Sequence, residues 1–318
     1  MQVLVSVIVI TYNHENFISK ALDSILSQKV NFNFEIIIGE DFSKDKTRDI
    51  VNKYQSDFSK IIRIVNSDEK LGMLKMEREA IKIANGKYLA FCEGDDFWHN
   101  EQKLQIQTDF LENNSEYGLV HSDVNHLHED QNRLIENFNN ANKITIPQGD
   151  IFLDLIDSNK FHGHLIKTMT VCFRKDLFER YWDYDLAIKK KWQLTDLPIW
   201  LEISKHSMIH YIPESLATYR LLAESASRSN NPVKLHAFHL SVYDVRRHYL
   251  LKYNLPQRLK KELEINFNLM LLSDSYSLGN SKMARKAKEY LGQNQVSLTS
   301  KQKIKFYFTI LYKWLGLN

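Results

Sequence analysis

The chain has 318 residues, enough for one large domain or two smaller ones. Its composition, 43% hydrophobic and 25% charged, excludes a disordered chain, and ten Gly and five Pro exclude a collagen-like or low-complexity sequence. The net charge of +3 is unevenly spread. Residues 251–318 carry 12 Lys and Arg against 4 Asp and Glu, a local charge of +8 that leaves −5 for the remainder.

Compartment and membrane topology are indicated by three features. The two cysteines, Cys92 and Cys172, lie in apolar stretches without metal-ligand spacing, which indicates buried free thiols in a reducing compartment. The apolar N-terminus lacks the basic lead-in and cleavage site of a signal peptide. Because no apolar run approaches the roughly 18 residues of a membrane span, we expect a cytoplasmic protein that does not cross the bilayer.

Strands and helices alternate through the first 112 residues. Residues 3–10 (VLVSVIVI) form the continuous β-branched run typical of a strand covered on both faces, and apolar residues at helical spacing predict a helix over 15–27. Further strands are predicted at 34–39, 61–65 and 87–92, and further helices at 46–54, 74–84 and 101–112. This alternation predicts an α/β fold with a doubly wound, mostly parallel sheet between flanking helices.

After residue 112 the pattern is mixed. The sequence predicts strands at 118–122 and 168–174, a long Asn-rich loop over 125–150, helices at 176–182 and 196–205, and a strand and a turn within 208–220. From residue 235 the chain is predicted to be mostly helical. Residues 301–318 form a basic, aromatic, amphipathic segment that suits the headgroup region of an anionic membrane, the body of the protein or a second subunit.

Carboxylates follow two strands of the predicted sheet. Glu40 and Asp41 come after one strand, and Glu93, Asp95 and Asp96 come after another. Because parallel strands end at the same edge of a sheet, both groups are expected to face one crevice. Clustered carboxylates repel one another unless a cation lies between them, and Mg²⁺ or Mn²⁺ prefers such oxygen ligands. The alternative is that these are solvated turn residues, which Asp and Gly favour for local reasons.

Three segments in this order and spacing carry a family resemblance: SVIVITYNHENFISKALDSILSQ, EIIIGEDFSKDKTRDI and NGKYLAFCEGDDFW. They resemble the inverting nucleotide-sugar glycosyltransferases of family 2, which have the GT-A fold. The resemblance implies a GT-A domain over 1–230, with a nucleotide-binding half of about 1–112 and an acceptor half of about 113–230. The remaining residues, 231–318, match nothing in the family and are expected to form a helical, basic extension.

The resemblance implies a binding site for a UDP-sugar donor. The turn after the first strand binds the nucleotide in the family, and one acidic residue after the second strand hydrogen-bonds the uracil ring. The matching residues here are Thr11, Tyr12, Asn13, Asp41 and Glu15, the last of them expected just inside the following helix. Glu40 takes the place of the family's preceding Asp.

Glu93, Gly94 and Asp95 match the family's DxD motif, whose last carboxylate binds the Mn²⁺ or Mg²⁺ that joins the two donor phosphates. Because Glu93 replaces the first Asp of the motif, Asp95 is the principal predicted ligand and Glu93 the second. Many relatives have a His after a Tyr-Arg pair, but Leu221 follows Arg220 here. The resemblance therefore implies a metal site completed by the diphosphate and water, or compensation by Arg220 or Arg228.

Sugar transfer also needs a base that accepts the proton of the attacking hydroxyl. The stretch KKKWQLTDLPIWLEISKH resembles the family segment that carries this base at the start of a helix, which makes Asp196 the candidate. A single displacement with Asp196 opposite the departing UDP inverts the anomeric carbon. The alternative for Asp196 is a helix cap, because Thr195 or Asp196 followed by Pro198 is typical of a helix N-terminus.

Four residues are candidates for the acceptor site. Asp96 and Trp98 belong to the third matched segment, His164 lies between matched segments, and Thr170 belongs to TMTVCFR, which resembles the family strand that faces the acceptor. Thr170 is equally well interpreted as a hydrogen-bonded threonine within a strand. The loose spacing of the histidines argues against structural zinc.

The sequence as a whole predicts a metal-dependent inverting hexosyltransferase that extends a surface polysaccharide or a lipid-linked oligosaccharide, and no nucleic-acid partner. The alternatives are a nucleotidyltransferase, although the Gly-rich basic loop of that class is missing from TYNHENF, and a non-catalytic nucleotide- or glycan-binding subunit.

Overall fold

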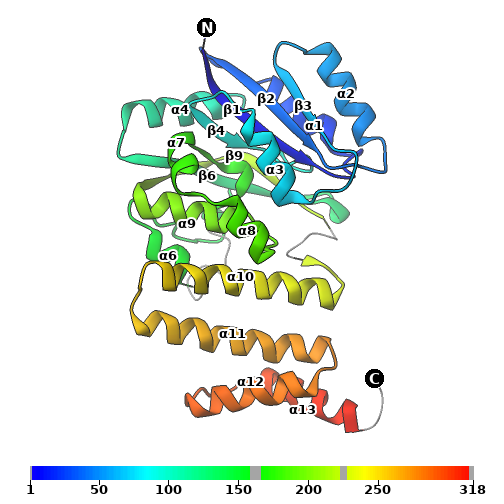
Figure 1. Ribbon diagram of the computed structural model, residues 1–318, viewed down its shortest axis with the longest axis vertical. Coiled ribbons are helices and arrows are strands. Elements are labelled where there is room, and N and C mark those ends of the chain that lie inside the picture. The colour runs from blue at the N-terminus through cyan, green and yellow to red at the C-terminus, as the bar shows by residue number, and fades with distance from the viewer. Residues whose placement is uncertain (1, 158–165, 223–227, 315–318) are drawn as a thin grey trace. The chain divides into compact units, whose positions relative to one another are not determined.

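The computed structural model describes residues 2–157, 166–222 and 228–314, and these residues form two compact units. The first, called here the sheet unit, comprises residues 1–154, 164–190 and 195–222. The second, the helical unit, comprises residues 155–163, 191–194 and 223–318. Figure 1 shows the sheet and the helices of each unit along the chain.

The sheet unit contains a mixed, mostly parallel sheet in the order β3-β2-β1-β4-β8-β6-β9-β5, with β7 paired to β6. Its strands are β1 Val3–Thr11, β2 Asn33–Glu40, β3 Ile62–Asn66, β4 Tyr88–Phe91, β5 Phe97–Trp98, β6 Tyr117–His128, β7 Arg133–Ile135, β8 Cys172–Arg174 and β9 Met208–Leu221. Strands β1 to β4 are parallel, and β8 is antiparallel to both β4 and β6. The predicted α/β class with a mostly parallel sheet is confirmed.

The parallel half follows from its sequence. Helices α1 Ile18–Leu26 and α2 Thr47–Asp57 connect β1, β2 and β3, and α3 Met73–Lys82 leads back across the sheet to β4. Because such crossovers are right-handed, α3 lies on the opposite face from α1 and α2. Strand β1 is therefore covered on both sides, which explains why its residues from Val3 to Ile10 are all apolar except for the small Ser6.

The remaining helices of the sheet unit are α4 Lys103–Asn113, α5 Phe138–Ala141, α7 Lys175–Tyr181, α8 Tyr184–Lys190 and α9 Asp196–His206, and α6 Phe152–Ile156 spans the boundary between the units. The helices predicted at 101–112, 176–182 and 196–205 are confirmed by α4, α7 and α9. Helix α8 was not predicted, because its lysine-rich sequence has no clear apolar face.

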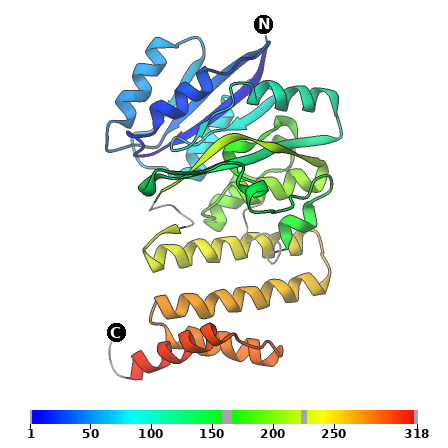
Figure 2. The same cartoon turned by 180° about the vertical axis from the view of Figure 1, so that it is seen from behind.

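Three predictions about the mixed part of the sheet beyond β4 are wrong in part, although the strands expected within 208–220 and 168–174 are present as β9 and β8. The loop predicted over 125–150 contains the end of β6, β7 and α5, because β6 pairs with β9 along its whole length, as Figure 2 shows from behind. The turn predicted within 208–220 is a bulge, since Ile212 and Ser215 pair with adjacent residues of β6 and leave Pro213 and Glu214 without partners in the register. The strand predicted at 168–174 begins at Cys172, after the 3₁₀ turn η2 Thr168–Thr170.

The helical unit contains α10 Pro232–Lys252, α11 Gln257–Ser277, α12 Ser281–Gln293 and α13 Ser300–Trp314, which confirms the helical C-terminal region. A small core joins the last three helices through Leu272, Ala284, Ala287, Leu291 and Phe306. Within the described part of the chain, none of the helices combines the length and apolar character that crossing a bilayer requires. Both cysteines, Cys92 and Cys172, are buried and unpaired, as expected.

Candidate functional site

The carboxyl ends of β2 and β4 meet at the end of β1. The Asp41 amide donates to the Thr11 carbonyl oxygen at 3.1 Å, and the Gly94 amide donates to the Ile10 carbonyl oxygen at 3.1 Å. A Cβ atom on Gly94 would lie only 2.6 Å from Thr11 Oγ1 and 2.7 Å from His14 Nδ1. Glycine is therefore required for the acidic loop after β4 to approach the turn after β1 this closely. Both acidic groups predicted at strand ends flank the same point of the sheet.

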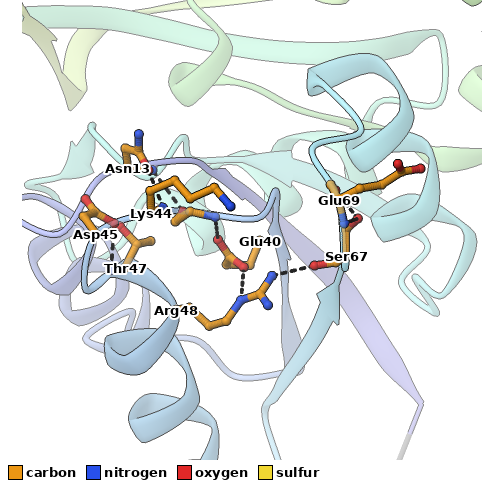
Figure 3. A network of polar contacts seen from close by, with 9 residues as sticks. Asn13, Glu40, Lys44, Asp45, Thr47, Arg48, Ser67 and Glu69 are labelled. Atoms are coloured by element: carbon orange, nitrogen blue, oxygen red, sulfur yellow. Dashed lines mark hydrogen bonds and ion pairs between the residues drawn. The ribbon is translucent and has the colours of Figure 1, made fainter.

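The turn after β1 is bound to the loop between β2 and α2 (Figure 3). Asn13 Oδ1 accepts from the Lys44 amide at 2.8 Å, and the Asn13 amide donates to Ser43 Oγ at 3.0 Å. Glu15 Oε2 accepts from the Lys46 amide at 3.0 Å. Glu15 lies in the turn before α1, which begins at Ile18, so its predicted position just inside the helix is wrong. These bonds give Asn13 and Glu15 a part in shaping the site.

Glu40 is buried beneath the same loop, where its charge is compensated. Its Oε1 accepts from the Ser43 amide at 2.6 Å, and its Oε2 forms an ion pair with Arg48 Nε at 2.5 Å. Arg48 also donates to the Ser67 carbonyl oxygen at 2.6 Å, which joins the ends of β2 and β3 (Figure 3). Both oxygens of the Glu40 carboxylate therefore hold this loop in place.

Asp41 is held by backbone amides from the segment between β3 and α3. Asp41 Oδ1 accepts from Leu71 N at 2.7 Å and Oδ2 accepts from Gly72 N at 3.0 Å. Burial raises the pKa of Asp41, against the opposing effect of these amides and of the Lys70 charge. The Lys70 ammonium lies 3.3 Å from the centroid of the Tyr12 ring. An exposed cation, a buried carboxylate and an aromatic ring therefore converge beside the end of β1.

The acidic loop after β4 is fastened to strand β9 by Arg220. The Arg220 amide donates to Asp96 Oδ1 at 2.7 Å, and Arg220 Nε donates to the Asp95 carbonyl oxygen at 2.8 Å. The guanidinium also forms an ion pair with Glu129 at 2.5 Å. Burial, together with the neighbouring charges of Asp95 and Glu93, raises the pKa of Asp96 well above its usual range. Arg220 therefore holds the backbone of this loop, and Asp96 is part of that attachment.

Glu93 and Asp95 are the candidate metal ligands. The Oε2 atom of Glu93 is buried and has no hydrogen-bond partner, and burial together with the charges of Asp95, Asp196 and Glu77 raises the pKa of Glu93 to about 8. An orphaned carboxylate oxygen beside other acids fits the vicinity of a cation. Among the described residues, no three His, Cys, Asp or Glu side chains are grouped to hold an ion by themselves. A metal here would take further oxygen ligands from the donor diphosphate and water.

Asp196 begins α9, at the helix start that the sequence predicts. Its Oδ1 accepts from the Leu197 amide at 2.7 Å, and burial raises the pKa of Asp196 while Lys167 opposes that shift. The charge of Asp196 contributes to the raised pKa of Glu93 and also to that of Glu77 on α3, which burial raises to about 7. Three carboxylates, from the loop after β4, from α3 and from α9, therefore lie within electrostatic range of one another.

Lys70 and Glu77 have no part in the predicted site. Within MLKMEREAIK, Glu77 is one of several charged residues of an amphipathic helix, and Lys70 is an isolated lysine in a loop. The one available signal for Lys70 was its place after the third strand, at the same edge of the sheet as the acidic residues.

Two of the residues predicted for acceptor binding, Trp98 and Thr170, are buried in the structure. Trp98 is buried and donates from Nε1 to the Met169 carbonyl oxygen at 2.9 Å, and Thr170 is fully buried with its hydroxyl bonded to the Lys167 carbonyl oxygen at 2.6 Å. These contacts favour core roles for both. His164 lies outside the described residues. Arg228 is exposed and belongs to the helical unit, so its role stays a prediction.

Comparison with known proteins gives related sequences. The chain is 28% identical over 223 residues to proteins of Mycobacterium tuberculosis and Mycobacterium bovis, covering 68% of this chain but only 58% of their length. It is 28% identical over 231 residues to the putative teichuronic acid biosynthesis glycosyltransferase TuaG of Bacillus subtilis, covering 70% of this chain and 81% of TuaG.

Solved structures with the same fold include TarS of S. aureus in complex with UDP-GlcNAc, with a TM-score of 0.54 and 14% identity over 98% of this chain and 92% of that one. The mannosyltransferase PcManGT from Pyrobaculum calidifontis in complex with GDP-Man and Mn²⁺ has a TM-score of 0.56 and 16% identity over 100% and 81%. At these identities the likeness shows the GT-A fold alone. The family model described as Glycosyl transferase family 2 matches residues 6–182, more than half of the chain. The chain is therefore a member of glycosyl transferase family 2.

Proposed function

We propose that this protein transfers a hexose from a UDP-sugar to a hydroxyl group of a glycan or lipid-linked oligosaccharide, with inversion at the anomeric carbon. The observation that carries the proposal is that carboxylates from two separate parts of the chain both raise the pKa of Glu93. Burial first, and then the charges of Asp95 in the loop after β4 and Asp196 at the start of α9, raise the pKa of Glu93. An activated sugar bound between these elements has a leaving-group site on one side and a base on the other.

The nucleoside end of the donor is assigned to the end of β1. Tyr12 offers an aromatic face, Asp41 offers a buried carboxylate for the uracil ring, and Lys70 offers a positive charge beside both. Thr11 and the shaped turn at Asn13 and Glu15 complete this side. Binding of UDP-GlcNAc by TarS, a protein of the same fold, supports the choice of a uridine nucleotide.

The diphosphate end is assigned to the acidic loop. Asp95 and Glu93 would hold Mn²⁺ or Mg²⁺, which when bound stabilises negative charge on the departing diphosphate. The Mn²⁺ in the complex of PcManGT supports a metal in this fold. Arg220 keeps the loop in place through the Asp95 carbonyl oxygen, which leaves the side chain of Asp95 for the ion.

Asp196 is the proposed general base. Its carboxylate accepts the proton of the attacking acceptor hydroxyl, while the acceptor oxygen bonds to the anomeric carbon and the bond to UDP breaks. Because the base and the leaving group lie on opposite sides of the sugar, one displacement inverts the configuration. Burial raises the pKa of Asp196, and a higher pKa makes a carboxylate a stronger proton acceptor near neutral pH.

The experiment that tests this proposal is donor hydrolysis. The full chain is incubated with Mn²⁺ and, in turn, UDP-glucose, UDP-galactose, UDP-GlcNAc and UDP-GalNAc, and the release of free UDP and sugar is measured. Slow hydrolysis of at least one donor is expected, because water can take the place of the acceptor hydroxyl. Binding of UDP-sugars without any turnover would favour a non-catalytic subunit, and formation of UDP-sugar from UTP and a sugar phosphate would favour a nucleotidyltransferase. Either outcome would contradict the proposed transfer.

A surface polysaccharide or its lipid-linked precursor is the proposed acceptor, which agrees with the teichuronic acid role named for TuaG. Such acceptors are assembled at membranes, and helix α13 carries a suitable surface. Its apolar stripe, Ile304, Tyr307, Phe308 and Leu311, repeats at helical spacing and is between 46% and 62% exposed. Phe306 on the same helix packs inward instead. Residues 281–311 contain seven Lys and Arg against one Glu, so this surface complements anionic lipid headgroups.

Replacing the four stripe residues by Gln is expected to abolish sedimentation of the protein with vesicles containing phosphatidylglycerol, because apolar burial and charge act together in such binding. The matched control replaces two exposed residues of α10, Val233 and Leu251, by Gln and should sediment as the wild type does. Pure phosphatidylcholine vesicles should capture little of any form. Equal sedimentation of the stripe variant and the wild type would contradict a membrane role for α13.

A further inference from the structure

Glu77 is a buried carboxylate that lies outside the acidic loop. It projects from the middle of α3 and is only 4% exposed, an expensive place for a group that is usually charged. Two hydroxyl groups compensate for its burial. Tyr184 donates from its hydroxyl to Glu77 Oε1 at 2.7 Å, and Thr195 Oγ1 donates to Glu77 Oε2 at 2.9 Å. Both carboxylate oxygens therefore hold a side chain from a later part of the sheet unit.

The bond from Thr195 is unusual for a residue in its position. Thr195 is the residue before the first turn of α9, where a threonine hydroxyl ordinarily accepts a hydrogen bond from an amide of that turn. Its side chain makes no such bond. The hydroxyl instead donates a hydrogen bond to Glu77, so the beginning of α9 is attached to α3 at the position next to Asp196.

We propose that Glu77 is a positioning residue for sugar transfer: it fixes Thr195, and through Thr195 it sets the direction of the Asp196 carboxylate. This inference rests on the proposed role of Asp196 as base. Glu77 itself exchanges no proton with the acceptor. The proton of the attacking hydroxyl goes to Asp196, and Glu77 holds the start of α9 at the distance and angle that the transfer needs.

Tyr184 provides a matched control within the same cluster. It donates to the other oxygen of Glu77 but comes from α8, to which no role in the proposed site is assigned. Tyr184→Phe removes one hydrogen bond from the same buried carboxylate and leaves the bond to Thr195 in place. A purely structural Glu77 would make the two bonds equivalent, whereas a positioning Glu77 makes the bond to Thr195 the one that matters for turnover.

The test uses the full chain, donor hydrolysis with Mn²⁺ as the rate measurement, and calorimetric titration with UDP as the binding measurement. Glu77→Ala and Thr195→Val should each lower kcat by about 10-fold to 100-fold, the scale of a misplaced catalytic group, with UDP affinity unchanged. The double variant should be no slower than the slower single variant, because both substitutions break one connection. Thr195→Ser, which keeps the hydroxyl, should restore most of the rate, and Tyr184→Phe should stay within about 2-fold of wild type.

Thr195→Val preserves side-chain volume, so it keeps the test available should Glu77→Ala fail to fold. The inference would be overturned if the fold-losses in kcat of the two single variants multiplied in the double variant. It would also be overturned if Tyr184→Phe and Thr195→Val lowered kcat equally. The same measurements distinguish a failure of the role proposed for Glu77 from a failure of the role proposed for Asp196. A slow Asp196→Asn variant beside a Thr195→Val variant of normal rate removes only the role of Glu77, whereas a fully active Asp196→Asn variant removes the base on which that role depends.

Discussion

Asp196→Asn is expected to lower sugar transfer by about 100-fold or more, the scale of a lost general base, while UDP binding stays near wild type. The substitution is well suited to the question because Asn retains an oxygen at Oδ1. The hydrogen bond from the Leu197 amide to Oδ1, 2.7 Å long in the structure, can therefore persist and keep the start of α9 in place. What Asn lacks is the ability to accept a proton from the acceptor hydroxyl.

The measurement is the initial rate of donor hydrolysis at saturating UDP-sugar, with UDP affinity measured separately. Asp185→Asn is the matched control, because Asp185 occupies the first turn of the neighbouring helix α8 and its side chain is 91% exposed. Its ion pair with Arg78 lies at the surface and contributes little to stability. Wild-type turnover in Asp196→Asn would show that another group takes the proton.

The pH dependence of the wild type follows from the same carboxylate. Burial raises the pKa of Asp196, and the base works only in its deprotonated form. The rate should therefore fall as the pH decreases through this raised pKa, above the value of about 3.9 that an ordinary Asp shows.

The parallel half of the fold could be predicted because its signals are local. Strand β1 is covered on both faces, and its eight apolar or small residues before Thr11 show this directly. The mixed half beyond β4, where β6 and β9 pair in parallel and β8 is antiparallel, was harder because strand pairing overrides local signals. The Pro213 and Glu214 pair suggests a turn, but β9 continues past it since β6 offers partners on either side. The Asn-rich segment after β6 likewise gains order from a distant contact, because the buried Asp123 carboxylate accepts from the amides of Asn139 and Asn140.

In the candidate site, too, some features could be predicted from the sequence and others depend on contacts between distant residues. Asp41 and Asp95 could be placed together from the sequence, because topology alone brings the ends of parallel strands to one edge. The directions of side chains cannot be obtained this way. Trp98 follows the acidic motif closely, yet its indole nitrogen bonds to the Met169 carbonyl oxygen in the core. Glu77 was missed because its hydrogen-bond partner Thr195 lies 118 positions away in the chain, so no local pattern marks the contact.

Asp95→Ala is expected to abolish the metal-dependent part of UDP binding. The substitution tests the side chain alone, because Arg220 Nε holds the loop through the Asp95 carbonyl oxygen, which alanine retains. Without this carboxylate, Glu93 is the remaining proposed protein ligand. Burial, the largest cause of its raised pKa, persists in the variant and favours the protonated acid, which is a poor ligand unless the ion displaces its proton. We expect UDP affinity in the presence of Mn²⁺ to fall by at least about 100-fold.

The decisive measurement of this metal site is a pair of UDP titrations for each variant, one with Mn²⁺ and one with EDTA. Wild type should bind much more tightly with Mn²⁺, and Asp95→Ala should bind equally weakly under both conditions, at the level of wild type in EDTA. Asp130→Ala, which removes an exposed carboxylate from the turn after β6, should behave as wild type. If Asp95→Ala keeps the full difference between Mn²⁺ and EDTA, the ion is held elsewhere. The buried oxygen of Glu93 that has no hydrogen-bond partner would then be explained by a proton on this carboxyl group, because burial and the charge of Asp95 raise its pKa.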